Sequence, residues 1–117
     1  MSTIGLDYDG VINQMTESSP GEFLPPIEGA LMAVTSFLRD GFEVVVYTAR
    51  TDLGEVKQWL VEHGFPKLVV TNEKLPADIY VDDKGYRFSG RWDKQKINEV
   101  KELAGGKSVT AGGKIID

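Results

Sequence analysis

The sequence predicts one α/β domain built on a parallel β-sheet, and two observations support this prediction. Short apolar runs alternate with segments whose apolar residues recur at helical spacing, which is typical of strands joined by helical crossovers. Residues 42–47 include three consecutive valines, and such a β-branched run indicates a strand that is covered on both faces. The expected architecture is therefore a three-layer α/β/α arrangement around a parallel sheet.

Four short apolar runs are expected to form the strands, at residues 3–7, 42–47, 68–71 and 79–81. The stretch from Asn13 to Pro26 is rich in Ser, Gly and Pro, so we expect a loop or hairpin over the sheet edge. Residues 1–104 are expected to form the core domain. A flexible or edge tail is expected at residues 105–117, which contain four glycines.

Three segments have the apolar spacing of helices. The first is expected to begin near Ile27, after two prolines, and to face the sheet with Leu31, Val34, Phe37 and Leu38. The second is expected to begin near Asp52, where Asp52 and Glu55 form a capping pair for the first turn. The third is expected at residues 93–104, with Ile97, Val100 and Leu103 on its apolar face.

The amino-acid composition excludes several classes of protein. No cysteine is present, which excludes disulfides and thiolate metal sites. The net charge of −5 argues against a general nucleic-acid binder, because that function needs a broad basic surface. No apolar run approaches the roughly 20 residues that span a bilayer, and the N-terminus lacks the pattern of a secretory signal. We therefore expect a cytoplasmic protein without a membrane partner.

Polar residues follow three of the four predicted strands. They are Asp7-Tyr8-Asp9-Gly10, Thr48-Ala49-Arg50 and Asp82-Asp83-Lys84. In an open parallel sheet, ligands bind beyond the carboxyl ends of the strands. Four carboxylates at one edge are costly unless a cation compensates them, and a hard divalent ion such as Mg²⁺ prefers oxygen ligands.

The spacing of these residues suits phosphate chemistry. Asp7 and Asp9 are two residues apart, so in a strand both point to the same face. One carboxylate can attack phosphorus while the other handles the proton. The Thr48 hydroxyl and the backbone amides beside it, including that of Ala49, can bind phosphate oxygens, and Lys74 can supply a positive charge.

Four motifs in this order resemble those of the haloacid dehalogenase-like (HAD) phosphohydrolases. They are Asp7-Tyr8-Asp9-Gly10-Val11, an apolar strand ending in Thr48, Lys74, and an apolar strand ending in Asp82-Asp83. The resemblance covers most of the chain and implies a Rossmann-like fold. Larger members of the family carry a cap domain after the first motif or between the second and third. Both gaps are too short for one here, so the resemblance implies a capless member.

The resemblance also implies a role for each matched residue. Asp7 is the implied nucleophile, and Asp9 is the implied general acid and then general base. Thr48 and Lys74 are the implied phosphate ligands. The implied Mg²⁺ ligands are Asp7, Asp9 through its backbone carbonyl, and either Asp82 or Asp83.

The function expected from these residues is cleavage of a phosphate monoester through an aspartyl-phosphate on Asp7. Arg50 and Lys84 are candidate substrate contacts, although a salt bridge of Arg50 is an equal alternative. Two other functions stay open: a regulatory module that binds Mg²⁺ and phosphate with little turnover, and a phosphatase acting on nucleic-acid ends. The expected partner is a small phosphorylated substrate, and a second copy of the chain is a candidate to cover the open site.

Overall fold

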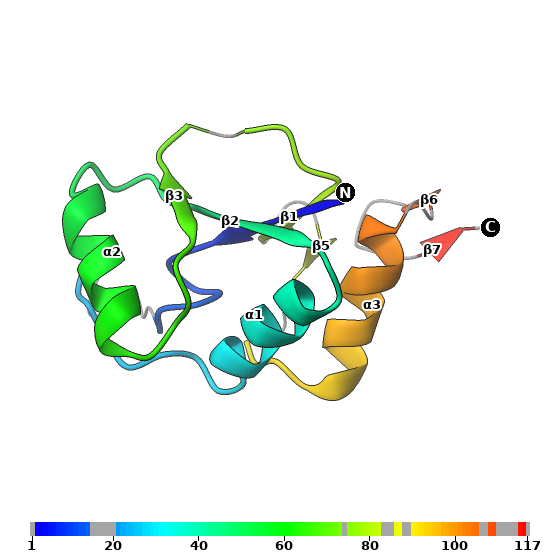
Figure 1. Cartoon of the computed structure of the whole chain (residues 1–117), viewed down its shortest axis with the longest axis horizontal. Coiled ribbons are helices and arrows are strands. Elements are labelled where there is room, and N and C mark those ends of the chain that lie inside the picture. The colour runs from blue at the N-terminus through cyan, green and yellow to red at the C-terminus, as the bar shows by residue number, and fades with distance from the viewer. Residues whose placement is uncertain are drawn as a thin grey trace.

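The computed structural model contains a parallel β-sheet and three helices within the residues that it describes (Figure 1). These are residues 2–14, 21–73, 75–82 and 90–105, with the backbone alone described for 86–87, 108–109 and 115–116. The helices are α1 (Ala30–Arg39), α2 (Leu53–Glu62) and α3 (Lys94–Ala104). The strands are β1 (Thr3–Asp7), β2 (Glu43–Tyr47), β3 (Val69–Thr71), β4 (Ile79–Asp82), β5 (Tyr86–Arg87), β6 (Ser108–Val109) and β7 (Ile115–Ile116).

The prediction of a parallel α/β sheet is confirmed. The strand order is β3-β2-β1-β4-β5, and all neighbouring strands run parallel. The four predicted strands are present, and the short edge strand β5 was not predicted. In the tail, β6 and β7 form a separate antiparallel pair. Across the described residues, we find no helix with the length and apolar character that spanning a bilayer requires.

One face of the sheet carries the hydrophobic core. Parallel partners in register point their side chains the same way. Leu6 of β1 pairs with Val46 of β2 and Val81 of β4, and all three are fully buried. The same cluster contains inward-facing residues of every helix, among them Phe37 of α1, Trp59 of α2 and Val100 of α3. All three helices therefore pack on this one face.

The opposite face of the sheet carries Gly5, Val45, Val69 and Tyr80. Gly5 pairs with both Val45 and Tyr80, and Val45 pairs with Val69. The Tyr80 ring lies over Gly5, where a β-carbon would collide with it. The Tyr80 hydroxyl donates a hydrogen bond to the carbonyl of Leu75. None of the described helices covers this face, so the predicted third layer is not confirmed.

Helix α1 differs from the prediction at its start and in its buried face. It begins at Ala30 because Gly29 has a φ of 83°, a left-handed conformation that lies outside a helix. The expected inward residues Leu31 and Leu38 are 39% and 36% exposed. The side chains that face the core instead include Ala30 and Ala33, whose small size lets the helix approach the sheet closely. A pattern based on large apolar residues misses such positions.

The predicted capping of α2 by Asp52 is wrong. Asp52 occupies the N-cap position, but its side chain makes no capping hydrogen bond. Its backbone has φ −87° and ψ 60°, not the extended conformation from which N-cap side chains reach the first turn. The side chains of Asp52 and Glu55 are hydrogen-bonded to each other instead, and this bond raises the pKa of Glu55 above its usual value. The contact needs a shared proton, so it is lost when both groups are ionised.

Replacing Gly29 by alanine is expected to lower the free energy of unfolding by about 3 kcal/mol. A non-glycine residue in the left-handed conformation costs about 1–2 kcal/mol. The added β-carbon would also collide with the backbone carbonyl oxygen of Trp92. The two segments cannot easily separate, because the Trp92 amide donates to the Glu28 carbonyl at 3.0 Å. Denaturant titration of both proteins measures the loss.

Gly41→Ala is the matched control for this substitution. Gly41 has a φ of 89°, but no atom lies within 4 Å of the position of an added β-carbon. Its substitution should therefore cost only the conformational part of the penalty. Equal losses in the two variants would show that the Trp92 contact has no energetic effect.

Candidate functional site

The carboxyl ends of β1 and β4 bring two acidic residues side by side. Leu6 of β1 pairs with Val81 of β4, so Asp7 and Asp82 occupy the next position on each strand. Neighbouring strands lie about 4.8 Å apart, and residues adjacent to an inward-facing pair point to the other face. Asp7 and Asp82 are thus neighbours on the sheet face away from the helices, and both are partly buried.

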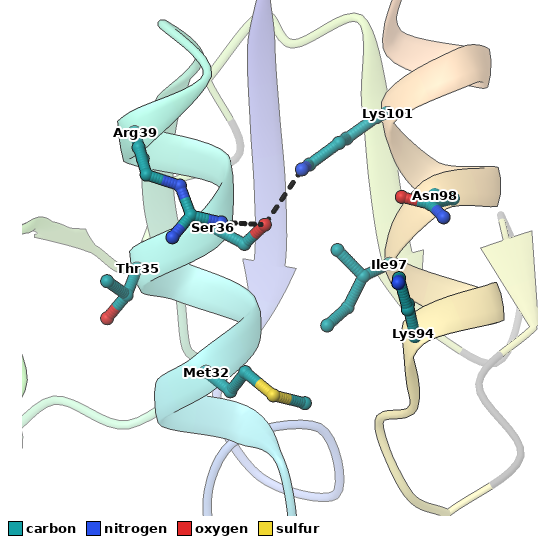
Figure 2. Close-up of a pocket in the computed structure, with 8 residues that line it drawn as sticks. All are labelled: Met32, Thr35, Ser36, Arg39, Lys94, Ile97, Asn98 and Lys101. Atoms are coloured by element: carbon teal, nitrogen blue, oxygen red, sulfur yellow. Dashed lines mark hydrogen bonds between the residues drawn. The ribbon is translucent and has the colours of Figure 1, made fainter.

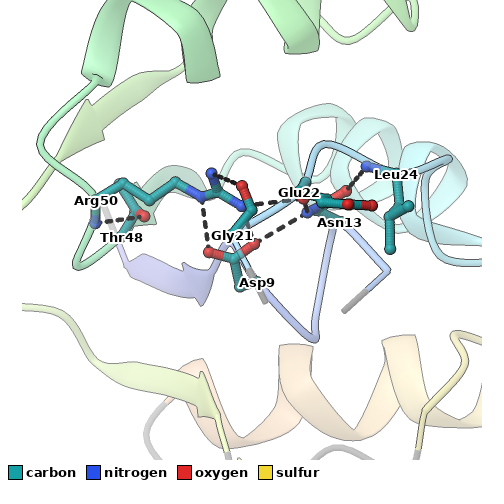
Figure 3. A network of polar contacts seen from close by, with 7 residues as sticks. All are labelled: Asp9, Asn13, Gly21, Glu22, Leu24, Thr48 and Arg50. Atoms are coloured by element: carbon teal, nitrogen blue, oxygen red, sulfur yellow. Dashed lines mark hydrogen bonds and ion pairs between the residues drawn. The ribbon is translucent and has the colours of Figure 1, made fainter. Parts of the chain in front are cut away.

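Asp9 accepts hydrogen bonds from two side chains that come from different segments (Figure 3). Arg50 donates from Nε to Oδ2 and from Nη2 to Oδ1, both at 2.9 Å. Asn13 donates from Nδ2 to Oδ1, also at 2.9 Å. The turn at Gly10, with a φ of 87°, brings Asn13 back beside Asp9. The carboxylate of Asp9 is therefore fixed in orientation by three donors.

The segment 21–24 closes over this network as a strap. Arg50 donates to the carbonyl oxygens of Gly21 at 2.8 Å and Glu22 at 3.1 Å. Asn13 donates to the same Glu22 carbonyl at 3.0 Å, and its own Oδ1 accepts from the Leu24 amide at 2.8 Å. The strap is thereby joined to the two residues that hold Asp9. Any movement of Asp9 away from Arg50 and Asn13 perturbs the strap as well.

The Arg50–Asp9 ion pair is shielded from water. The side chain of Arg50 is 11% exposed and that of Asp9 21%. The guanidinium also lies 4.4 Å from the centre of the Phe23 ring, within the range of a cation–π contact. The hydrogen bonds with Asp9 raise the pKa of Arg50 above its ordinary value, so the guanidinium stays charged. Of the two alternatives for Arg50, the structure shows the salt bridge.

Tyr8, between the two acids in sequence, points into the core. It is fully buried, and its ring meets Trp59 edge-on with centres 5.3 Å apart. Its hydroxyl has no hydrogen-bond partner among the described residues. Burial raises the pKa of Tyr8 far above its usual value. The phenol therefore stays neutral and supplies no base at physiological pH.

Thr48 lies at the end of β2 with its side chain fully buried. Its amide donates to the Thr71 carbonyl at 3.0 Å, and its hydroxyl oxygen accepts from the Arg50 amide at 3.1 Å. The backbone amides of Thr48 and Arg50 are therefore already engaged within the fold. The hydroxyl hydrogen of Thr48 and the amide of Ala49 are the candidate donors to a phosphate.

Lys74, Asp83 and Lys84 lie outside the described residues, so their predicted roles stay predictions. Among the residues that are described, no three His, Cys, Asp or Glu side chains gather closely enough to hold a metal ion. The neighbouring Asp7 and Asp82 remain chemically suitable, because Mg²⁺ commonly uses one or two carboxylates and keeps several waters. Asp9 offers its backbone carbonyl, since its carboxylate is held by Arg50 and Asn13.

Comparison with known proteins found no matching family model, no matching curated protein and no matching solved structure. The resemblance to the HAD phosphohydrolases therefore rests on the motifs of this sequence.

Sequence reasoning missed Asn13 and the strap. Asn13 is fully buried although it is polar, and its amide group makes the three hydrogen bonds described above. A single signal was available in the sequence: a polar residue directly follows the apolar pair Val11 and Ile12. That signal does not reveal which partners the side chain finds, because the strap residues are about ten positions further along the chain.

Asn13→Ala is expected to lower the free energy of unfolding by about 2–3 kcal/mol, because it removes a fully buried amide group and its three hydrogen bonds. Gln14→Ala is the control, because Gln14 is an exposed neighbour with one side-chain hydrogen bond, to the Pro26 carbonyl at 3.3 Å. That change should cost about 0.5 kcal/mol or less. Thermal melts of both variants make the comparison. Similar melting temperatures would contradict the assignment of Asn13 as the residue that joins Asp9 to the strap.

Proposed function

We propose that this protein is a Mg²⁺-dependent phosphohydrolase of the capless HAD type, which cleaves a phosphate monoester through an aspartyl-phosphate on Asp7. The observation that carries the proposal is the placement of Asp7 and Asp82 as neighbours at the carboxyl edge of a parallel sheet. Ligands of open parallel sheets bind at this edge. Thr48 lies at the same edge on the other side of β1, since Asp7 pairs with Tyr47.

In the proposed reaction, a carboxylate oxygen of Asp7 attacks phosphorus while the bond from phosphorus to the leaving oxygen breaks. The leaving oxygen keeps the electron pair of that bond and takes a proton from Asp9. Water then attacks the phosphorus of the aspartyl-phosphate and gives a proton to Asp9. The bond between phosphorus and the Asp7 oxygen breaks, and its electron pair stays on that oxygen, so inorganic phosphate is released and the Asp7 carboxylate is restored. Asp7, the Asp9 carbonyl and Asp82 or Asp83 would hold Mg²⁺. The bound ion would neutralise phosphate oxygens.

The network around Asp9 adds a requirement to this scheme. Arg50 and Asn13 are both donors, so Asp9 serves purely as an acceptor toward them. That state suits the second step, in which Asp9 takes a proton from water. In the first step Asp9 must carry a proton, so Arg50 has to withdraw from at least one carboxylate oxygen. An anionic substrate favours that withdrawal, because its phosphate offers Arg50 an alternative partner.

A screen of phosphate monoesters at neutral pH tests the proposal. The panel contains an aryl phosphate, sugar phosphates, nucleotides and 5′- and 3′-phosphorylated oligonucleotides. We expect Mg²⁺-dependent release of inorganic phosphate that stops when EDTA is added and returns with excess Mg²⁺. Release that is unaffected by EDTA would contradict the role of the metal.

One observation favours a second candidate function, a module that binds Mg²⁺ and phosphate with little turnover. Asp9 is engaged in a shielded ion pair, which is a poor starting state for a general acid. This candidate predicts a rise in melting temperature with Mg²⁺ and phosphate and no hydrolysis of any panel member. Hydrolysis that is lost in the Asp7→Asn variant would exclude this second candidate.

A further inference from the structure

A pocket that is separate from the acids at the strand ends lies between α1 and α3 (Figure 2). Its volume is about 420 Å³, within the range of small-molecule sites. Among the residues that line it are Ser36, Arg39 and Met32 from α1 and Ile97, Asn98 and Lys101 from α3. None of the residues proposed for phosphate hydrolysis lines this pocket, so an inference drawn from it does not depend on that proposal.

Two cationic side chains converge on one neutral oxygen in this pocket. Lys101 donates from Nζ to Ser36 Oγ at 2.7 Å, and Arg39 donates from Nη2 to the same oxygen at 3.5 Å. Ser36 is buried, and the Lys101 side chain is only 17% exposed. Two like charges on one acceptor repel each other, and water screens only part of this repulsion, because Arg39 is exposed while Lys101 is partly buried. The arrangement is therefore prepared for an anion.

The residues that line the pocket carry an excess of positive charge. Arg39, Lys94 and Lys101 line it, and no Asp or Glu belongs to the lining among the described residues. Asp40 contacts Lys101 at 2.5 Å from outside the pocket, and its carboxylate is 45% exposed. The hydrogen bond from Lys101 lowers the pKa of Asp40, so its negative charge is present at neutral pH. Glu99 and Glu102 lie outside the pocket, around a neighbouring hollow that Lys94 and Asn98 also line. Such a basic surface stands out on a chain whose net charge is −5.

Donor groups remain for a ligand after these contacts are counted. An ammonium group has three N–H bonds, and Lys101 uses two, for Ser36 and Asp40. A guanidinium has five, and Arg39 uses one for Ser36. The Ser36 oxygen accepts both contacts, so its own hydrogen can be donated to a ligand oxygen. Lysine, arginine and hydroxyl donors directed to one point match the tetrahedral oxygens of a phosphoryl group.

Away from Ser36, two apolar side chains line the pocket. Met32 is 54% exposed, and its side chain extends from α1 toward α3 beside Ile97 (Figure 2). An exposed flexible methionine next to a buried isoleucine offers an adaptable surface to an apolar group. The pocket thus presents both cationic and apolar groups to one ligand.

We propose that this pocket is a binding site for a phosphorylated small molecule. Its phosphoryl group contacts Arg39, Lys101 and the Ser36 hydroxyl, and its carbon skeleton lies against Met32 and Ile97. A phosphoryl group is preferred over a carboxylate, because it offers three oxygens and a higher negative charge to the lysine, arginine and hydroxyl donors that meet at this point. We assign the site to binding and not to catalysis, because no His, Cys, Asp or Glu that could activate the Ser36 hydroxyl belongs to its lining among the described residues.

Binding of phenylphosphonate tests this site, because a phosphonate is not hydrolysed and carries both a dianionic and an apolar end. Titrations are followed by amide chemical shifts of the full chain in EDTA, with Asp7→Asn as the background to suppress binding at the strand ends. We expect saturable shifts centred on Ser36 and Asn98. Arg39→Gln and Lys101→Met should each weaken the affinity at least about tenfold, while inorganic phosphate should bind more weakly than phenylphosphonate.

Lys57→Gln is the control, since Lys57 is an exposed cation on α2 and its loss changes the net charge equally. Melting curves show whether each variant is folded. If Lys101→Met is not folded, the affinity of Arg39→Gln alone tests the proposed site. An affinity that falls equally in the Lys57 variant would overturn the proposal, as would shifts confined to residues outside α1 and α3. So would the absence of any saturable binding up to about 10 mM, a very weak affinity.

Discussion

Asp7→Asn is expected to reduce the hydrolysis of an aryl phosphate by at least about a thousandfold. Asparagine has the size of aspartate, but its neutral amide is a far weaker nucleophile toward phosphorus. It also supplies one fewer charged oxygen to a divalent cation. Because the change preserves side-chain volume, the fold should be retained. Steady-state kinetics with saturating Mg²⁺ measure the loss of activity, and circular dichroism shows whether the fold is retained.

Asp93→Asn provides the matched control for this loss. Asp93 caps α3 by accepting a hydrogen bond from the Lys96 amide at 2.8 Å, and asparagine is an equally good N-cap residue. Asp93 has no role in the proposed reaction, so the same chemical change there should leave kcat within about twofold of the original value. Appreciable turnover in a folded Asp7→Asn protein would assign the nucleophile to another residue.

Arg50→Ala is expected to lower kcat/KM by about a hundredfold, because Asp9 loses two of the three hydrogen bonds that orient it. The same variant should lose about 3 kcal/mol of stability, since it leaves a shielded carboxylate without its ionic partner. Activity is therefore compared well below the melting temperature of each protein. Steady-state kinetics against substrate concentration separate the loss in kcat from the change in KM.

Arg50→Lys and Lys57→Ala make this experiment specific. Lysine keeps the charge but cannot form the two parallel bonds to Asp9 and reach the strap carbonyls as well. We expect its activity to lie between those of the original protein and Arg50→Ala. Lys57→Ala removes an exposed cation from α2 and should change activity by less than about twofold. Full activity in Arg50→Lys would show that charge alone matters at this position.

The sheet was predictable from the sequence because its information is local. Each buried strand is a short apolar run. A run of β-branched residues such as that of β2 indicates a strand even when the neighbouring strands are unknown. The start of α1 was less predictable. Its position depends on the left-handed conformation of Gly29 and on the close approach of Trp92, which lies far away along the chain. Contacts of this kind leave no periodic signal.

The candidate site was predictable in part for the same reason. Asp7 and Thr48 follow apolar strands, so their position at the sheet edge follows from the strand assignment. The ion pair between Asp9 and Arg50 joins residues 41 positions apart, and its geometry depends on the strap and on Asn13. The sequence left the salt bridge and a substrate contact as equal alternatives. The residue pattern alone cannot distinguish the two alternatives, because both use the positive charge of Arg50.

Detection of a phosphoryl group on Asp7 tests the proposed chemistry most directly. The protein is mixed with excess aryl phosphate and Mg²⁺, quenched in acid within one turnover, and digested for tandem mass spectrometry. We expect one added phosphoryl group on the peptide that contains Asp7, absent after Asp7→Asn and absent in EDTA. Rapid release of phosphate with no modified Asp7 at any quench time, or with the group on another residue, would contradict nucleophilic catalysis by Asp7.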